Sequence, residues 1–192
     1  MELLPTGARA ICADIGDERL AAMTDSFTIR TLDADDLDRI AATDGGPAWN
    51  PDPVLWQGYL ADAVEGCRII LLALQGQDIV GYGTLLWQSG YPPFKAVGIP
   101  EINNLVVAHS ARGGGIATAM IGRFEQLAAS AGRAAIGLGV GLYADYGAAQ
   151  RLYIRLGYLP DGRGITYGET LVAPDQLVRV DDDLILWLTK PL

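Results

Sequence analysis

The apolar positions of the chain follow two different periods. Residues 68–74 and 79–87 form two apolar runs joined by the polar stretch 75–78, which is the outline of a β-hairpin. From residue 116 to residue 128, apolar residues recur instead at about every third or fourth position, which indicates an amphipathic helix packed on a core. The pattern therefore predicts a chain that combines strands with helices.

Shorter patterns predict the other elements. Acidic residues at the start of 33–40 suit the positive end of a helix dipole, whereas the glycines and prolines of 43–53 cannot continue a helix. The segment SGYPPFKAVGIPE at 89–101 is also broken by glycine and proline, and it predicts a loop. In chain order we expect a strand at 27–31, helices at 33–40 and 54–65, strands at 162–168 and 184–189, and a solvated turn at 181–183.

Composition and charge exclude several classes of protein. With 192 residues, 50% of them hydrophobic, the chain is long and apolar enough for one domain, which we expect at 27–192 after a less patterned extension at 1–26. The net charge of −9 argues against a nucleic-acid or acidic-membrane partner and suits a cationic one. We recognise no membrane span or secretory signal, so a cytoplasmic protein is expected. Two isolated cysteines and one histidine predict no disulfide framework and no metal site.

A strand, a glycine turn and a helix follow one another in the stretch that begins EINNLVVAHSARGGGIA at residue 101. Gly113, Gly114 and Gly115 have no Cβ, so an anion can approach the N–H groups that begin the helix, and Arg112 adds a guanidinium. A flexible turn without a ligand is the alternative. The lysine ending of a P-loop and the glycine spacing of a dinucleotide fingerprint are both absent, which argues against ATP and NAD.

A short motif adds to this pattern. Arg112, Gly115 and Ala117 fit the sequence Arg/Gln-x-x-Gly-x-Gly/Ala, which follows the predicted central strand. The motif resembles the signature of the GNAT superfamily of N-acetyltransferases, and this resemblance implies a turn that holds the pyrophosphate of acetyl-CoA. The cofactor-binding residues that we take from it are Leu105, Val106, Val107, Arg112, Gly113, Gly114, Gly115, Ile116, Ala117 and Tyr146.

A second block strengthens the resemblance. The segment AAIGLGVGLYADYGAAQRLYIRLGY at 134–158 reads as a buried strand, a turn and a short helix. The second motif of the family has the same form, with an alanine, then Leu-Tyr, then Leu-Gly-Phe/Tyr. One departure is Tyr146, which stands where the family commonly has asparagine, and this puts a detail of the CoA contact in question. The matching residues are Ala148 or Ala149, Leu152, Tyr153, Leu156, Gly157 and Tyr158.

The resemblance also implies a fold of class α+β, with a mixed, largely antiparallel sheet of six or seven strands, a bulged central strand and helices on both faces. Here Asn103 and Asn104 interrupt the two-residue period of the central strand, as a β-bulge would. A bulge that only relieves sheet twist is the alternative. In the family the central strand is splayed so that the pantetheine arm of CoA bonds to its backbone, which implies main-chain contacts from Leu105 and Val107.

Acetyl transfer to an amine needs an acceptor for the amine's proton and a donor to the departing thiolate. Tyr153 matches the family tyrosine near the thioester sulfur, which implies that its phenol donates to the thiolate; a buried core tyrosine is the alternative. Glu101 is the candidate base, directly or through water, although a carboxylate at a strand end is often only solvated. The implied activity is transfer of acetyl to a primary amine, and a non-catalytic CoA-binding regulatory domain is the second hypothesis.

The acceptor amine is expected near the loops 49–56 and 89–101 and the segment around Tyr167. Candidates for the acceptor are a small polyamine, an aminoglycoside-like molecule, an amino acid and a protein N-terminus. Whether the protein forms a homodimer is left open. An aromatic wall could line the acceptor site, with Glu101 and Asp52 attracting a cation; the alternative is that the aromatic residues only pack in the core. The aromatic residues are Trp49, Trp56, Tyr91, Phe94 and Tyr167.

Overall fold

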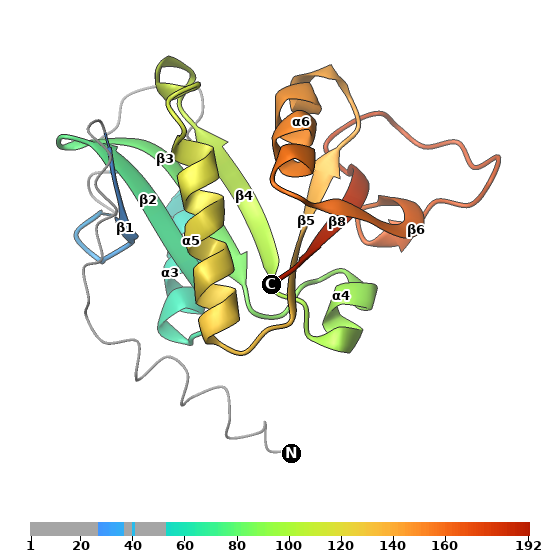
Figure 1. Cartoon of the computed structure of the whole chain (residues 1–192), viewed down its shortest axis with the longest axis horizontal. Coiled ribbons are helices and arrows are strands. Elements are labelled where there is room, and N and C mark those ends of the chain that lie inside the picture. Colours follow the sequence, from blue (N-terminus) through green and yellow to red (C-terminus); the bar gives the residue numbers. More distant parts are fainter. Residues whose placement is uncertain (1–26, 37–39, 41–52) are drawn as a thin grey trace. The chain divides into compact units, whose positions relative to one another are not determined.

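The computed structural model of the protein describes residues 27–36, 40 and 53–192 (Figure 1). These residues divide into two compact units. The first contains the described residues up to Thr84 together with Asn104–Met120, and the second contains Leu85–Asn103 and Ile121–Leu192. The predicted N-terminal extension, residues 37–39 of the predicted helix at 33–40 and nearly all of the predicted loop at 43–53 lie outside the described residues.

The sheet of the first unit has the strand order β1-β2-β3-β4. β1 (Thr28–Thr31) pairs antiparallel with β2 (Arg68–Gln75). β2 and β3 (Asp78–Leu86) form the predicted hairpin around Gly76, whose φ of 60° is left-handed and therefore suits a glycine. β4 (Glu101–Val107) begins in the second unit and ends in the first.

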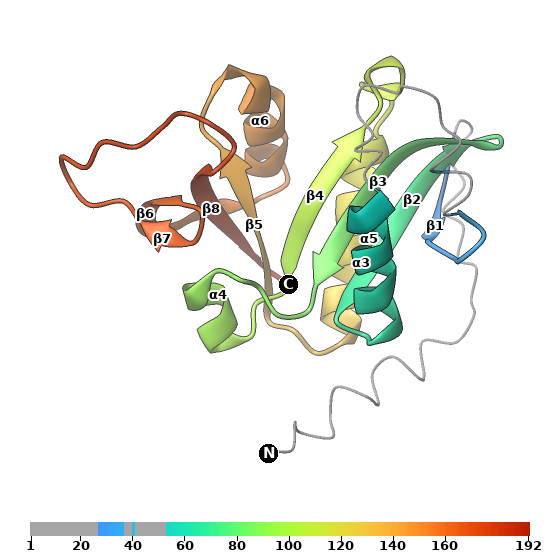
Figure 2. The ribbon, with the colours of Figure 1, turned by 180° about the vertical axis from the view of Figure 1, so that it is seen from behind.

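The core of the first unit lies between the sheet and α3 (Pro53–Val64), which covers one face of β2 (Figure 2). Trp56 of this helix packs edge-to-face with Tyr59, with ring centroids 5.7 Å apart, and with Tyr82 of β3 at 4.9 Å. Such ring pairs add about 0.5–1.5 kcal/mol to the stabilisation from buried area. The helix predicted at 54–65 is confirmed, and its core neighbours are Ile40, Ile70, Leu72, Leu74 and Ile79.

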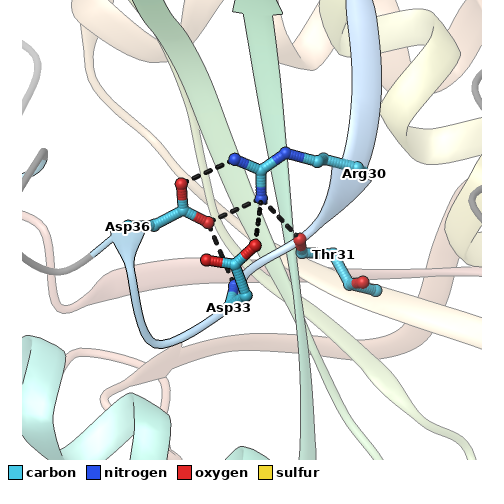
Figure 3. A network of polar contacts seen from close by, with 4 residues as sticks. All are labelled: Arg30, Thr31, Asp33 and Asp36. Carbon is cyan, nitrogen blue, oxygen red and sulfur yellow. Dashed lines mark hydrogen bonds and ion pairs between the residues drawn. The ribbon is translucent and has the colours of Figure 1, made fainter.

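An ion pair fixes the turn that follows β1 (Figure 3). Both terminal nitrogens of Arg30 lie 2.6 Å from the two carboxylate oxygens of Asp36, which is 1% exposed, and the backbone N–H of Asp33 donates to the same carboxylate at 3.0 Å. Burial alone would raise the pKa of Asp36, but the hydrogen bonds and the charge of Arg30 outweigh it and lower that pKa. The first strand is therefore tied to the segment after it.

The sheet of the second unit has the strand order β4-β5-β8-β6-β7. β4 pairs parallel with β5 (Ala135–Gly141), and β5 pairs antiparallel with β8 (Leu184–Pro191). β6 (Leu159–Tyr167) is antiparallel to β8 and to the two-residue strand β7 (Thr170–Leu171), and it begins earlier than the predicted strand at 162–168. The mixed, largely antiparallel sheet is as expected, but the described residues form eight strands rather than six or seven.

The predicted loop at 89–101 is wrong in part, because it contains the helix α4 (Pro92–Val97). Pro92 and Pro93 occupy its first positions, where a helix needs no backbone N–H, so the prolines start the helix rather than prevent it. The helix ends at Gly98, whose φ is 70° and whose N–H donates to the carbonyl of Lys95. Proline and glycine therefore mark the two ends of this helix.

Two further helices carry the motifs found in the sequence. α5 (Ile116–Ser130) confirms the predicted amphipathic helix, and α6 (Gly147–Arg155) confirms the short helix of the second motif. Single 3-10 turns precede them at His109–Ala111 and Ala144–Tyr146. The buried face of α5 consists of Ile116, Met120, Ile121, Phe124, Leu127 and Ala128.

Candidate active site

The glycine turn lies in the first unit and leads directly into α5. Gly113 and Gly115 have φ values of 81° and 84°, which residues with a Cβ rarely adopt, so the predicted need for glycine holds at these two positions. A Cβ added to either of them would meet no atom within 4 Å, and the turn from Arg112 to Gly115 is exposed. The start of α5 therefore presents backbone N–H groups in an open, glycine-lined turn, and its first turn contains no acidic residue.

Arg112 is held at the root of this turn. Its Nε donates to the carbonyl oxygen of Val107, the last residue of β4, at 3.1 Å. This bond leaves the two terminal nitrogens of the guanidinium as further donors. The positive charge therefore stays beside the glycines, where an anion on the N–H groups of α5 would gain from it.

The strand residues Leu105, Val106 and Val107 are half-buried on the last part of β4. The preceding residue, Asn104, has a φ of 51°, which is an irregularity at the place of the predicted bulge. The side-chain amide of Asn104 donates to the hydroxyl of Tyr59. Asn104 is thereby anchored within the first unit at the point where the strand is irregular.

Glu101 opens β4 in the second unit and is 5% exposed. The hydroxyl of Ser89 donates to its Oε2 at 2.5 Å, and the side-chain amide of Asn103 donates to its Oε1 at 3.0 Å. The predicted base is therefore a buried, hydrogen-bonded carboxylate rather than a solvated one. Neither partner was among the predicted site residues, and only the closeness of Asn103 in the sequence gave a signal for either.

Tyr153 lies on α6, 8% exposed, with its ring centroid 6.2 Å from that of Tyr158. Burial raises the pKa of Tyr153 to about 12. Among the described residues, no hydrogen-bond partner of its hydroxyl is found. The phenol is therefore protonated near neutral pH and has a donor to offer.

Tyr146, the residue that departs from the family motif, is the last residue of the 3-10 turn before α6. Its ring occupies the space where Gly141 has no Cβ, since a Cβ there would lie 2.5 Å from ring atoms of Tyr146. The hydroxyls of Tyr146 and Tyr143 both donate to Oδ1 of Asp182, which accepts the Tyr146 bond at 2.9 Å. Asp182 was predicted to be only part of a solvated turn, so this partner of Tyr146 was missed.

The predicted aromatic wall is largely core packing. Trp56 belongs to the core of the first unit at 2% exposure. In the second unit, Tyr91 stacks on Trp187 with ring centroids 4.2 Å apart, and Phe94 packs edge-on against both. Tyr167 donates to Asp181, another residue of the predicted solvated turn, at 2.7 Å. Trp49 and Asp52 lie outside the described residues.

The described residues also bear on other classes of site. No group of three or more histidine, cysteine, aspartate or glutamate side chains is placed to hold a metal ion in the part of the chain that the structure describes. None of the helices in the same part is long and apolar enough to cross a membrane.

Comparison with known proteins identifies both a family and a fold. The model of the acetyltransferase (GNAT) family matches residues 34–158, which contain the glycine turn and the second motif. No curated protein matches the chain. Among solved structures, the chain is similar to a ribosomal-protein-alanine N-acetyltransferase from Brucella melitensis, with 20% identity, a TM-score of 0.62 and coverage of 85% of this chain and 99% of that one.

Two further structures have the same fold. A spermidine/spermine N-acetyltransferase from Vibrio cholerae is 15% identical, with a TM-score of 0.59 and coverage of 86% and 92% of the two chains. A GNAT family acetyltransferase from Elizabethkingia anophelis, solved with acetyl-CoA bound, is 19% identical, with a TM-score of 0.57 and coverage of 88% and 100%. These likenesses show the fold alone, whereas the family model covers well over half of the chain.

Proposed function

The chain belongs to the acetyltransferase (GNAT) family, and from this premise we propose that it transfers the acetyl group of acetyl-CoA to a primary amine by direct attack of the amine on the thioester. The observation that carries the proposal is the glycine turn. Its two left-handed glycines, its exposed N–H groups and the anchored Arg112 have the properties that a diphosphate requires.

The fit of the turn to CoA can be argued from its side chains. Gly113 and Gly115 leave open space where other residues would place a Cβ, and the first turn of α5 has no carboxylate that would repel phosphate. We assign pyrophosphate binding to Arg112–Ala117 through the backbone and the guanidinium, and pantetheine binding to the backbone of Leu105, Val106 and Val107. We keep Tyr146 as a CoA contact through its ring, because its hydroxyl is engaged with Asp182.

Glu101 and Tyr153 supply the two proton-handling groups in this proposal. Glu101 accepts the proton of the amine, directly or through a water, and its burial makes a nearby positive charge favourable. The Tyr153 hydroxyl donates to the thiolate that leaves, because it is protonated and has no hydrogen-bond partner among the described residues. When bound, acetyl-CoA supplies the activated acetyl group; the residues supply orientation and proton transfer.

The charge of the protein, rather than the shape of a pocket, is the basis on which we propose an acceptor. The net charge of −9 and the buried carboxylate of Glu101 favour a small or cationic amine. A solved neighbour is named for spermidine and spermine, and another for the alanine of a ribosomal protein, so both a polyamine and a protein N-terminus belong in a first panel. We place the reaction in the cytoplasm and expect no metal to take part.

A non-catalytic CoA-binding domain is the competing function, and Glu101 and Tyr153 favour the enzyme over it. The test is release of free CoA thiol from acetyl-CoA in the presence of spermidine, an aminoglycoside, free amino acids and an alanine-terminated peptide. The enzyme releases thiol in step with acetylation of at least one of these amines. Binding of CoA without acetylation of any amine in the panel would favour the regulatory domain.

A further inference from the structure

Ser89 is a buried hydroxyl that joins the start of α4 to Glu101. Its side chain is 1% exposed, so bulk water does not compete for its hydrogen bonds. The Oγ of Ser89 accepts the backbone N–H of Tyr91 at 3.0 Å and donates to Oε2 of Glu101 at 2.5 Å. One side chain thus receives a hydrogen bond from the segment that begins α4 and gives one to the carboxylate at the start of β4.

The hydroxyl of Ser89 has two lone pairs and one proton, and the N–H of Tyr91 occupies one of the lone pairs. The hydroxyl proton is donated to Oε2 of Glu101. On the other side, Asn103 places its amide on Oε1. A charged carboxylate accepts stronger hydrogen bonds than a neutral carboxyl group, so both bonds are strongest when Glu101 is ionised.

We propose that Ser89 is a positioning residue for acetyl transfer, whose hydroxyl holds the Glu101 side chain in one orientation for the acceptor amine. This inference rests on the proposed function, in which Glu101 receives the proton of the amine. The carboxylate of Glu101 has about four acceptor positions on its two oxygens, and the bonds from Ser89 and Asn103 occupy one on each oxygen. They restrict which direction a water or an ammonium group can approach from, and orientation of this kind is a large part of catalysis.

The test is a double-mutant cycle of Ser89→Ala and Glu101→Gln, assayed with acetyl-CoA and the fastest amine of the panel. Ser89→Ala should lower kcat roughly 10- to 100-fold, the scale of a hydrogen bond to a charged group, and leave the KM for acetyl-CoA unchanged. Ser89→Thr, which keeps the hydroxyl, should restore most of the rate. The double variant should be no slower than Glu101→Gln alone, because Ser89 acts through Glu101.

Two controls separate positioning from stability. Asp36→Ala removes a buried carboxylate of the first unit that accepts from Arg30 at 2.6 Å. It should lower the melting temperature and leave kcat within about twofold of the wild type, because Asp36 has no place in the proposed binding or proton-transfer groups. If Ser89→Ala does not fold, Ser89→Cys keeps a side chain of similar size with a weaker donor, and the same fall in kcat is expected.

The outcomes distinguish this proposal from the function on which it rests. If Glu101→Gln is slow while Ser89→Ala turns over at the wild-type rate, the positioning role is wrong and the enzyme proposal stands. A double variant slower than Glu101→Gln by the full effect of Ser89→Ala shows that Ser89 acts independently of Glu101, and this also overturns the proposal. If Glu101→Gln is as fast as wild type, or if no amine is acetylated, the proposed role of Glu101 fails and the Ser89 role fails with it.

Discussion

Replacing Tyr153 by phenylalanine removes one hydroxyl from a buried ring and tests what that hydroxyl does. Its pKa is about 12, whereas an ordinary thiol has a pKa of about 8.5. Complete proton transfer from such a phenol to a thiolate is therefore unfavourable by about 5 kcal/mol, at about 1.4 kcal/mol for each tenfold change in acidity. The expected role is a hydrogen bond to the developing negative charge, not a completed proton transfer.

This role sets the size of the effect. A hydrogen bond to a charged group contributes about 1.5–3 kcal/mol, so Tyr153→Phe should reduce kcat roughly 10- to 150-fold. The hydroxyl has no hydrogen-bond partner among the described residues, so its removal leaves none of them unpaired and the melting temperature should change little. The assay is thiol release at saturating acetyl-CoA, together with a thermal melt of the same preparation.

Two results would refute this reasoning in different ways. A loss well above a thousandfold would mean that the phenol completes the proton transfer, since general acids reach about 10²–10⁴. An unchanged kcat would show that the hydroxyl makes no hydrogen bond to the developing thiolate and would remove Tyr153 from the mechanism.

Two predictions concern the scaffold. Chemical denaturation should show that Asp36→Ala lowers the free energy of unfolding by about 2 kcal/mol. This loss is smaller than the loss expected on breaking a fully buried ion pair, because the Arg30 side chain is 27% exposed. Because the pKa of Asp36 is lowered in the folded protein, its contribution is present above the unfolded pKa of about 4 and is lost as the pH falls further, so wild type and variant should converge in acid. Gly137→Ala would place a Cβ 2.2 Å from Cε2 of the buried Phe94, so it should destabilise the protein by about 1–3 kcal/mol in the same experiment; an unchanged midpoint would contradict the packing of Phe94 on β5.

The sequence predicted those features that depend on local spacing. The spacing of apolar residues along the chain predicts the hairpin of β2 and β3 and the amphipathic face of α5. The backbone angles of a tight turn predict the need for glycine at Gly113 and Gly115. The sequence did not predict the helix α4, because proline disrupts a helix interior, whereas Pro92 and Pro93 occupy its first positions, where proline is favourable.

The partners of the site residues were less predictable, because they are brought together by the fold. Ser89 is twelve positions from Glu101, and Asp182 is thirty-six from Tyr146, and no local pattern links either pair. The aromatic residues illustrate the same limit. Tyr91 and Phe94 are aromatic, as residues of a binding wall would be, but they pack in the core against Trp187, which lies near the C-terminal end of the sequence.

Binding of CoA through the glycine turn is the central claim, and the thermal shift of the protein with CoA tests it most directly. Wild type with CoA at about a hundred times its Kd should gain about 2.7 kcal/mol, or roughly 5–10 °C in Tm for a chain of this size. Gly115→Glu places a carboxylate at the start of α5 and should abolish the shift. Gly58→Glu, which adds the same charge in open space on α3, should keep it. A full CoA shift in the Gly115→Glu variant would contradict the assignment of the turn as the phosphate site.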